Sequence, residues 1–288
     1  MVSASARREA VRYAHSRGLS KRRAGVLMNI GGSSLRYKTR QVDAESEVMA
    51  KIRVLSAANP RFGYRFVAAL LRREGLVINN KRVYRLWRKA GLARRRKPAY
   101  RRRHGGQHRW MSAVAPNGVW AYDFVFDACA NGQKLKCLTV VDEFTRESLA
   151  IKVGARVRTA DVINVLERLV ALHGPPAHLR SDNGPEFVAT AVQGWLRENG
   201  IGTAYIQPGK PWQNGVAESF NSKFRDECLN MEWFNNRREA TVVIEAWRQS
   251  YNNHRPHSAI GYRTPAEQRA RAMAIANQRS NQLGDAAA

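Results

Sequence analysis

Three acidic side chains lie at points of the chain where their charge needs an explanation. Asp123 falls in the middle of the apolar stretch GVWAYDFVFDA, and Asp182 follows a second apolar stretch in HLRSDNGPEF. Glu218 lies in PWQNGVAESFNSKFRDECL, whose apolar residues repeat at helical spacing. A carboxylate inside an apolar strand costs free energy unless its charge is matched. The three residues indicate a divalent-metal site, although Asp182 alone could equally cap a turn.

The chemistry depends on whether the acidic side chains converge. If the strand that ends at Asp182 runs beside the strand of Asp123, the two carboxylates meet near one edge of the sheet. Two such groups repel each other, and one keeps its proton unless a divalent cation lies between them. Mg²⁺ suits this position because it binds one or two carboxylates together with substrate phosphates. Asp127 and Asp142, also on expected strands, are alternative ligands.

The segment of Glu218 predicts an amphipathic helix that begins after Asn214-Gly215. At about 100° per residue, Arg225 lies on the same side of that helix as Glu218. We therefore expect a metal ligand beside a phosphate contact, and the alternative is an ordinary Glu–Arg pair on a surface helix. The opposite side of the helix carries apolar residues: Val216, Ala217, Phe220, Phe224 and Cys228.

The elements that would position these residues follow an α/β order. Strands rich in β-branched and aromatic residues alternate with helical patterns after residue 118. Thr159 is the expected N-cap of the first of these helices, and Gly174 its stop. The expected strands are 118–128, 134–145, 148–155, 178–182 and 202–207, with helices at 159–174 and 187–200. This order predicts a mixed sheet with helices on both faces.

The net charge differs between residues 1–111, the basic front, and the remainder of the 288-residue chain, the body. Residues 1–111 hold 29 Lys and Arg against 5 Asp and Glu, whereas the remainder holds 20 against 18. So basic a segment favours a polyanionic partner, above all nucleic acid. The sequence therefore predicts a DNA-binding front and a separate catalytic body.

Residues 5–40 predict short helices interrupted at Gly18-Leu19-Ser20 and at residues 29–32. Ser20 is a suitable N-cap, and another helix could start near Ser33. Helices joined by a glycine-containing turn fit a helix-turn-helix, in which the second helix enters the major groove. An ordinary helical hairpin is the alternative.

A second helical pair is expected over residues 62–91, followed by a basic linker. The second helix of the pair, with Asn79 or Asn80 as its cap, buries one apolar stripe and exposes a cationic face. Such a one-sided face repels itself unless an anion neutralises it. The expected phosphate contacts are Lys81, Arg82, Arg85, Arg88 and Lys89 on the helix, and Arg94, Arg95, Arg96, Arg101, Arg102 and Arg103 in the linker. Phosphate contacts of this kind give little base preference.

The same patterns predict five parts of the chain. They are a helix-turn-helix-like basic segment (1–42), a helical DNA-binding domain (43–93), a basic linker (94–111), a catalytic core (112–235) and a C-terminal helical extension (236–288). Cys129, Cys137 and Cys228 are too scattered for a disulfide framework or a zinc site. With no signal-peptide or membrane-spanning run, we expect a cytoplasmic protein with reduced cysteines.

Five segments together resemble a known family. RFGYRFVAALLRREGLVINNKRVYRLWRKAGL, WAYDF, RSDNGPEF, PWQNGVAESFNSKFRDE and NNHRPHSAIGYRTPAEQ resemble, in this order, the OrfB product of bacterial insertion sequences of the IS-three family. Asp123, Asp182 and Glu218 resemble the DDE core of retroviral-type integrases. The resemblance implies a ribonuclease-H-like fold preceded by small helical DNA-binding domains. It also implies metal-dependent cleavage of element ends and strand transfer.

The resemblance also implies roles and partners. Asp123, Asp182 and Glu218 would be both the catalytic residues and the ligands of two Mg²⁺ ions, with Mn²⁺ as a substitute. Arg225 would contact a phosphate, and Asn183 would either contact DNA or form its turn. The expected partners are double-stranded DNA (element ends and target), further copies of the chain, and the upstream OrfA product or a fusion with it. The DNA substrate implies association with the bacterial nucleoid.

Two rival functions remain open at this point. One is a non-catalytic DNA-binding regulator, in which only the basic front acts. The other is a two-metal nuclease that cuts DNA without joining it. His254, Arg255 and His257 invite a catalytic reading, but two-metal chemistry leaves them no obvious task. We interpret their segment as structural, or as a subunit or DNA contact.

Overall fold

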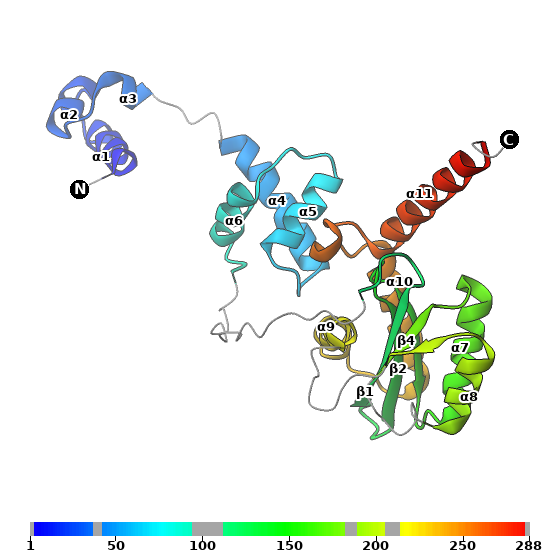
Figure 1. Cartoon of the computed structure of the whole chain (residues 1–288). Coiled ribbons are helices and arrows are strands. Elements are labelled where there is room, and N and C mark those ends of the chain that lie inside the picture. Colours follow the sequence, from blue (N-terminus) through cyan, green and yellow to red (C-terminus); the bar gives the residue numbers. More distant parts are fainter. Residues whose placement is uncertain (1–2, 37–41, 94–111, 182–188, 205–213, 286–288) are drawn as a thin grey trace, which may run out of the picture. The chain divides into compact units, whose positions relative to one another are not determined.

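The structure is a computed structural model that describes residues 3–36, 42–93, 112–181, 189–204 and 214–285 (Figure 1). Contacts between residues divide the chain into two compact units. The first unit comprises Met1–Ala58 and Asn79–Ala93, and the second comprises Asn59–Ile78 and Arg94–Ala288.

The first unit begins with three short helices, α1 (Ala4–Ser16), α2 (Lys21–Leu27) and α3 (Gly32–Arg36). The predicted interruptions are confirmed. Ser20 caps α2 by accepting a hydrogen bond from the backbone N–H of Arg23 at 3.3 Å. A side chain at Gly25 would meet Leu35 at 3.0 Å, so glycine permits the close approach of α2 and α3.

The first unit also contains α4 (Val42–Ala58) and α6 (Asn80–Lys89), which pack against each other. Asn79 caps α6 as predicted, accepting from the N–H of Arg82 at 2.8 Å. The predicted apolar stripe of α6 is buried at Val83, Leu86 and Trp87. Helix α4 was not among the predicted elements.

The second unit contains α5 (Tyr64–Arg73) and a five-stranded sheet. Strands β1 (Val119–Ala128), β2 (Lys134–Asp142) and β3 (Ser148–Gly154) form an antiparallel meander. Strands β4 (His178–Arg180) and β5 (Gly202–Thr203) extend the sheet in parallel with β1. The resulting order, β3-β2-β1-β4-β5, confirms the predicted mixed sheet and is ribonuclease-H-like.

Helices cover both faces of this sheet, as predicted (Figure 1). Trp120 and Tyr122 of β1 pack with α7 (Thr159–His173) and α8 (Thr190–Glu198). Val125 of the same strand packs on the opposite face, in a second core with α9 (Gly215–Phe224) and α10 (Arg237–Asn253). Because alternate residues of a strand face opposite sides, Asp123 shares the α9 face with Val125.

The chain after α9 continues in an unusual way. A π-helical turn, η2 (Arg225–Leu229), follows α9 directly, and the N–H of Asn230 donates to the carbonyl of Arg225 at 2.8 Å. After α10, the short 3₁₀ helix η3 (Ser258–Ile260) leads into α11 (Pro265–Asp285). The apolar side predicted for the α9 helix is confirmed, because Ala217, Phe220, Phe224 and Cys228 are buried.

Some predicted details differ from the structure. Thr159 is the first residue of α7 and Arg158 is its N-cap. The reason is that the Asp161 carboxylate accepts the backbone N–H of Arg158 at 2.8 Å, so the helix supplies its own cap from the first turn. Gly174 ends α7 with φ 78°, as predicted.

Strand β4 ends at Arg180 rather than at Asp182 within the described residues. The three cysteines are free and buried, in agreement with the expectation of reduced thiols.

Candidate active site

Asp123 lies half-buried in the centre of β1, opposite Thr139 of β2. Its Oδ1 accepts the backbone N–H of Phe124 at 2.7 Å, and its Oδ2 accepts the side-chain amide of Asn221 at 2.8 Å. The amide oxygen of Asn221 in turn accepts the Thr139 hydroxyl at 3.0 Å. Asn221 belongs to α9, so this chain of hydrogen bonds ties the carboxylate of Asp123 to that helix.

Glu218 lies in the first turn of the same helix, with an exposed side chain. Residues three apart on a helix are neighbours on its surface. Glu218 therefore shares a helix face with Asn221, whose amide contacts Asp123. A neighbouring face of α9 is fixed by burial of Phe220 and Phe224 against the sheet. The structure thus brings the helix face of Glu218 to the part of β1 that carries Asp123.

Asp182 and Asn183 lie outside the described residues, but the strand that leads to them is described. Arg180 of β4 pairs with Ala121 of β1 in parallel register. Its guanidinium is buried and donates to both carboxylate oxygens of Glu143, at 2.7 and 2.9 Å. Burial raises the pKa of Glu143, and the charge of Arg180 opposes that rise. This buried ion pair fixes the end of β4.

The two alternative ligands have other contacts. Asp142 is fully buried, and one carboxylate oxygen accepts hydrogen bonds from the backbone of Phe144 and from Thr145, through both its N–H and its hydroxyl. Its other oxygen accepts the N–H of Asn117 at 2.7 Å. Asp142 therefore organises the turn after β2. Asp127 lies four residues beyond Asp123, and its Oδ1 accepts the N–H of Ala128.

Arg225 continues the helical backbone of α9, with φ −64° and ψ −48° and its N–H bonded to the carbonyl of Asn221. It is the first residue of η2, and its guanidinium donates to the backbone carbonyl of Phe126 in β1 at 2.9 Å. The side chain is exposed. In the described part of the chain it forms no ion pair with Glu218, so the surface Glu–Arg pair does not form.

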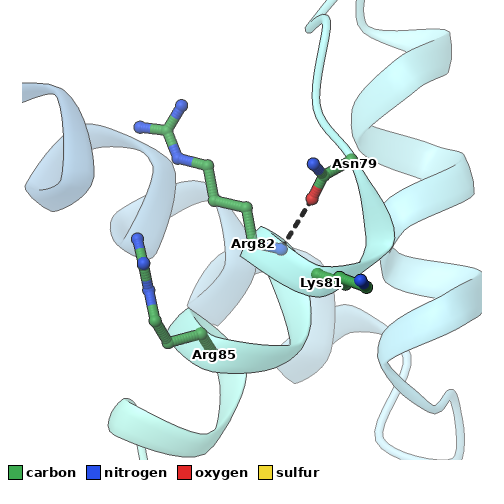
Figure 2. A pocket seen from close by; sticks show the side chains of 4 residues that line it. All are labelled: Asn79, Lys81, Arg82 and Arg85. Carbon is green, nitrogen blue, oxygen red and sulfur yellow. Dashed lines mark hydrogen bonds between the residues drawn. The ribbon is translucent and has the colours of Figure 1, made fainter.

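The basic face predicted for α6 is present in the first unit. Lys81, Arg82 and Arg85 line a hollow at the start of the helix with the N-cap Asn79, and Arg82 and Arg85 extend to the same side (Figure 2). Arg85 is partly neutralised by Glu45 of α4 at 2.5 Å. The helix N-terminus adds a partial positive charge, so the hollow suits a phosphate. Arg88 and Lys89 are exposed near the other end, and the six linker arginines lie outside the described residues.

In the C-terminal motif NNHRPH, Arg255 and His257 are buried, whereas His254 is the exposed C-cap of α10. Arg255 is buried and forms a two-pronged ion pair with Glu227 of η2, at 2.5 and 2.6 Å. His257 is also buried, with its ring edge-on to Tyr251 at 4.7 Å. Burial, together with the nearby charge of Arg255, lowers the pKa of His257 to about 3. This histidine is neutral at physiological pH, and the structural interpretation fits these contacts.

Sequence reasoning missed three contributors to this site: Asn221, Thr139 and the Arg180–Glu143 pair. A signal existed for Asn221, because it lies three residues after Glu218 on the predicted helix and carries an amide that can donate to a carboxylate. No local pattern signals the ion pair, whose partners are 37 residues apart.

The donor set determines which metal would fit. Among the described residues no three His, Cys, Asp or Glu side chains gather closely enough to hold an ion. Two members of the predicted set, Asp123 and Glu218, belong to the described residues, and both offer only carboxylate oxygens as ligands. Oxygen donors without nitrogen or sulfur suit Mg²⁺ and Mn²⁺ and disfavour zinc or copper.

Comparisons with known proteins agree with this geometry. Family models match three stretches: an HTH-like domain over residues 43–102, and integrase core domains over residues 113–211 and 199–265. The chain is 46% identical to the 31.7 kDa protein of insertion element IS407 from Burkholderia multivorans, over 90% of this chain and 94% of that protein. It is 31% identical to the transposase InsD of insertion element IS2 from Escherichia coli, over 80% of each chain.

Solved structures with a similar fold include two integrase cores. One is the HTLV-2 integrase catalytic core in complex with magnesium, with TM-score 0.42 and 18% identity over 55% of this chain and 99% of that one. The other is the BIV integrase catalytic core, with TM-score 0.44 and 21% identity over 57% and 99%. Within the described ranges, every helix of the chain is too short or too polar to span a bilayer.

Proposed function

The chain belongs to the OrfB transposases of the IS-three family of insertion sequences, and from this premise we propose that Asp123, Asp182 and Glu218 are its catalytic carboxylates. It is a DNA transposase with an integrase-type core, a polynucleotidyl transferase. Family membership establishes this activity.

The parallel pairing register between β1 and β4 is the main support for this proposal. Val119, Trp120 and Ala121 pair with His178, Leu179 and Arg180 in parallel. The same register, continued two residues beyond Arg180, would pair Asp123 with Asp182. Directly paired residues of parallel strands project from the same face, and neighbouring strands lie about 4.8 Å apart. Two carboxylates at that spacing suit a shared divalent cation.

Helix α9 supplies the third carboxylate to the same face. Asn221 contacts the Asp123 carboxylate, and Glu218 precedes it by three residues on one side of the helix. A rotation of the Glu218 side chain toward Asp123 would complete a set of three carboxylates. The donor chemistry of that set fits two Mg²⁺ ions, or Mn²⁺ in their place.

The residues of the chain then have distinct tasks. Asp123, Asp182 and Glu218 would hold the two ions, which when bound activate water or a 3′-hydroxyl and stabilise the leaving oxygen. Asn221 and the N–H of Phe124 fix the orientation of the Asp123 carboxylate. Arg180 and Glu143 fix the strand that leads to Asp182. Chemistry of this kind needs no covalent enzyme intermediate.

The basic front would hold the DNA. Helix α6 carries a cationic face within the match to the HTH-like domain, formed by the half-buried Arg82 and the exposed Lys81, Arg85, Arg88 and Lys89. Together with Arg94, Arg95, Arg96, Arg101, Arg102 and Arg103 they would contact phosphates of element ends and target. Arg225 is close enough to β1 to reach a bound strand if it releases the Phe126 carbonyl. Asn183 is either a DNA contact or a turn former.

Assembly and location are part of the proposal. We expect the active species to contain several copies of the chain, because two element ends must be brought together. We also expect cooperation with the upstream OrfA product or a fusion with it, at the bacterial nucleoid where the DNA substrate lies. Purification with and without the upstream frame, followed by end-binding measurements, tests this.

The experiment that tests the site is an end-cleavage and joining assay with Mg²⁺ and labelled element-end DNA. The expected result is cut and joined products from the wild type, and neither from Asp123→Asn, Asp182→Asn or Glu218→Gln. Asp127→Asn, on the same face of β1, is the matched control and should stay active. Full activity in any of the three carboxylate variants would remove that residue from the site. Cut products without joining would favour a nuclease, and binding alone a regulator.

A further inference from the structure

Helix α9 is followed by a π-turn whose first three residues each have a partner in a different part of the second unit. Arg225 donates to the Phe126 carbonyl of β1 at 2.9 Å. Asp226 lies 3.3 Å from the guanidinium of Arg61. Glu227 accepts both prongs of Arg255. A π-turn takes one residue more per turn than an α-helix and persists only where contacts stabilise it.

The Glu227–Arg255 pair is the most buried of these contacts. The two side chains are 12% and 7% exposed. The guanidinium of Arg255 lies over the ring of Phe66 at 4.9 Å, and near those of Phe62 and Tyr251 at 5.5 and 5.7 Å. Water is therefore excluded on the faces of the guanidinium, while its edge meets the carboxylate. The relative orientation of the two side chains is fixed, because the planar guanidinium donates two parallel hydrogen bonds to the planar carboxylate.

We propose that Arg255 and Glu227 position the active-site helix: their ion pair holds η2 in its π conformation, and η2 fixes where α9 presents Glu218 relative to Asp123. This inference rests on the proposed role of Glu218 as a metal ligand. Helix α9 is anchored to the sheet through Asn221 at its middle and through η2 at its C-terminal end. Release of the second anchor lets the helix rotate about the first.

The HRPH segment (residues 254–257) and the start of α5 then share one role, the support of α9. Phe62 and Phe66, which cover Arg255, lie within the second unit's share of the residues matched by the HTH-like domain. Arg61, one residue earlier, holds Asp226. Residues 61–66 therefore support the helix that carries Glu218, and they are positioning residues rather than catalytic ones.

The test uses the full chain and measures Mn²⁺ binding by electron paramagnetic resonance, without DNA, beside thermal unfolding. The main variant replaces both partners by apolar residues, Arg255→Met with Glu227→Leu, because removal of a buried pair in this way often preserves stability. We expect an unfolding midpoint close to that of the wild type and Mn²⁺ affinity about tenfold weaker, the size of effect typical of residues that orient metal ligands. Glu227→Gln, which removes only the charge, should act in the same direction.

The matched control is the pair Arg73→Gln with Glu267→Gln. Arg73 and Glu267 also form a two-pronged ion pair, at 2.5 and 2.9 Å, between α5 and α11, but neither contacts α9 or η2 in the described structure. Their replacement should leave Mn²⁺ affinity unchanged. An equal loss in this control would assign the effect to docking of α5 and overturn the inference.

The remaining outcomes separate the two proposals. If the wild type binds Mn²⁺ and Asp123→Asn does not, the metal site stands. Unchanged affinity in the Arg255–Glu227 variants would then overturn the positioning role alone. Failure of both the double variant and Glu227→Gln to fold would assign the pair to stability and also overturn it. No Mn²⁺ binding by the wild type would overturn the metal site and, with it, this inference.

Discussion

Both carboxylate oxygens of Asp123 accept hydrogen bonds, so the orientation of this half-buried carboxylate is fixed. The backbone of Phe124 fixes one oxygen, and Asn221 fixes the other across 98 residues of sequence. Such outer contacts orient a metal ligand before the metal arrives, so that little reorganisation is needed on binding. Asn221 therefore links the strand of one carboxylate to the helix of another.

Replacement of Asn221 by alanine tests that link. Asn221→Ala removes the amide that donates to the Asp123 carboxylate and one of two acceptors of the Thr139 hydroxyl, which keeps the Asp123 carbonyl at 3.2 Å. We expect end cleavage to slow by about 10- to 100-fold, with a higher Mg²⁺ requirement. The loss of unfolding free energy should be only about 1–3 kcal/mol. Ser222→Ala, at the next and exposed position, is the control, and equal slowing in both variants would contradict the link.

His257 makes the stability of the second unit depend on pH. Burial lowers its pKa from 6.5 to about 3 in the folded chain. A depressed pKa means that the folded state binds the proton less readily than the unfolded state. The stabilisation is therefore complete above pH 6.5 and is lost as the pH falls toward 3, by at most about 1.4 kcal/mol per pH unit.

Urea unfolding of wild type and His257→Phe over this pH range measures the effect. The phenyl ring keeps the contact with Tyr251 and cannot titrate. We expect the unfolding free energy of the variant to fall less steeply below pH 6.5 than that of the wild type. Parallel curves for the two proteins would show that His257 is protonated in the folded state.

At the scale of elements, strand β4 is short but strongly anchored. It has three residues, and its last side chain forms a buried ion pair with Glu143, which follows β2. The pair helps to hold β4 in its parallel register with β1. Removal of one partner leaves the other charge buried and unmatched, which is much more costly than removal of both.

Two variants test this anchoring. Arg180→Met should lower the unfolding free energy by about 3–5 kcal/mol. Addition of Glu143→Leu should recover most of that loss, because the unmatched carboxylate is then gone. Urea unfolding measures both. If the single variant is as stable as the wild type, β4 is held by its backbone hydrogen bonds and not by the ion pair.

The sequence predicted elements better than the contacts between them. The caps at Ser20 and Asn79 and the buried side of α9 follow from patterns a few residues long. The Asn221–Asp123, Arg180–Glu143 and Arg255–Glu227 contacts join residues far apart, and no local pattern encodes them. Helix α4 has no clear apolar side, and the π-turn after α9 depends on partners elsewhere in the fold. Asp182 lies outside the described residues, and its place beside Asp123 stays a prediction.

At the scale of the molecule, charge is concentrated where DNA is expected. Residues 1–111 carry a formal net charge of +24 out of +26 for the chain. A cationic face that contacts phosphates releases counterions on binding, so the affinity falls steeply with salt. Binding strength would come mainly from this front, and the chemistry from the nearly neutral body.

The salt dependence of binding measures the contribution of α6. Lys81→Ala with Arg82→Ala should weaken binding to all DNA sequences alike and reduce the slope of log affinity against log salt by about two, roughly one for each contact. Arg168→Ala, an exposed arginine on α7, is the control and should change neither. An unchanged slope in the double variant would place the phosphate contacts elsewhere on the front.

Anomalous diffraction from crystals of the full chain grown with Mn²⁺ tests the central claim most directly. We expect manganese peaks about 2.0–2.2 Å from carboxylate oxygens of Asp123, Asp182 and Glu218. Two ions about 4 Å apart would complete the two-metal arrangement. Ordered carboxylates of these three residues with manganese bound elsewhere, or with none between them, would contradict the account.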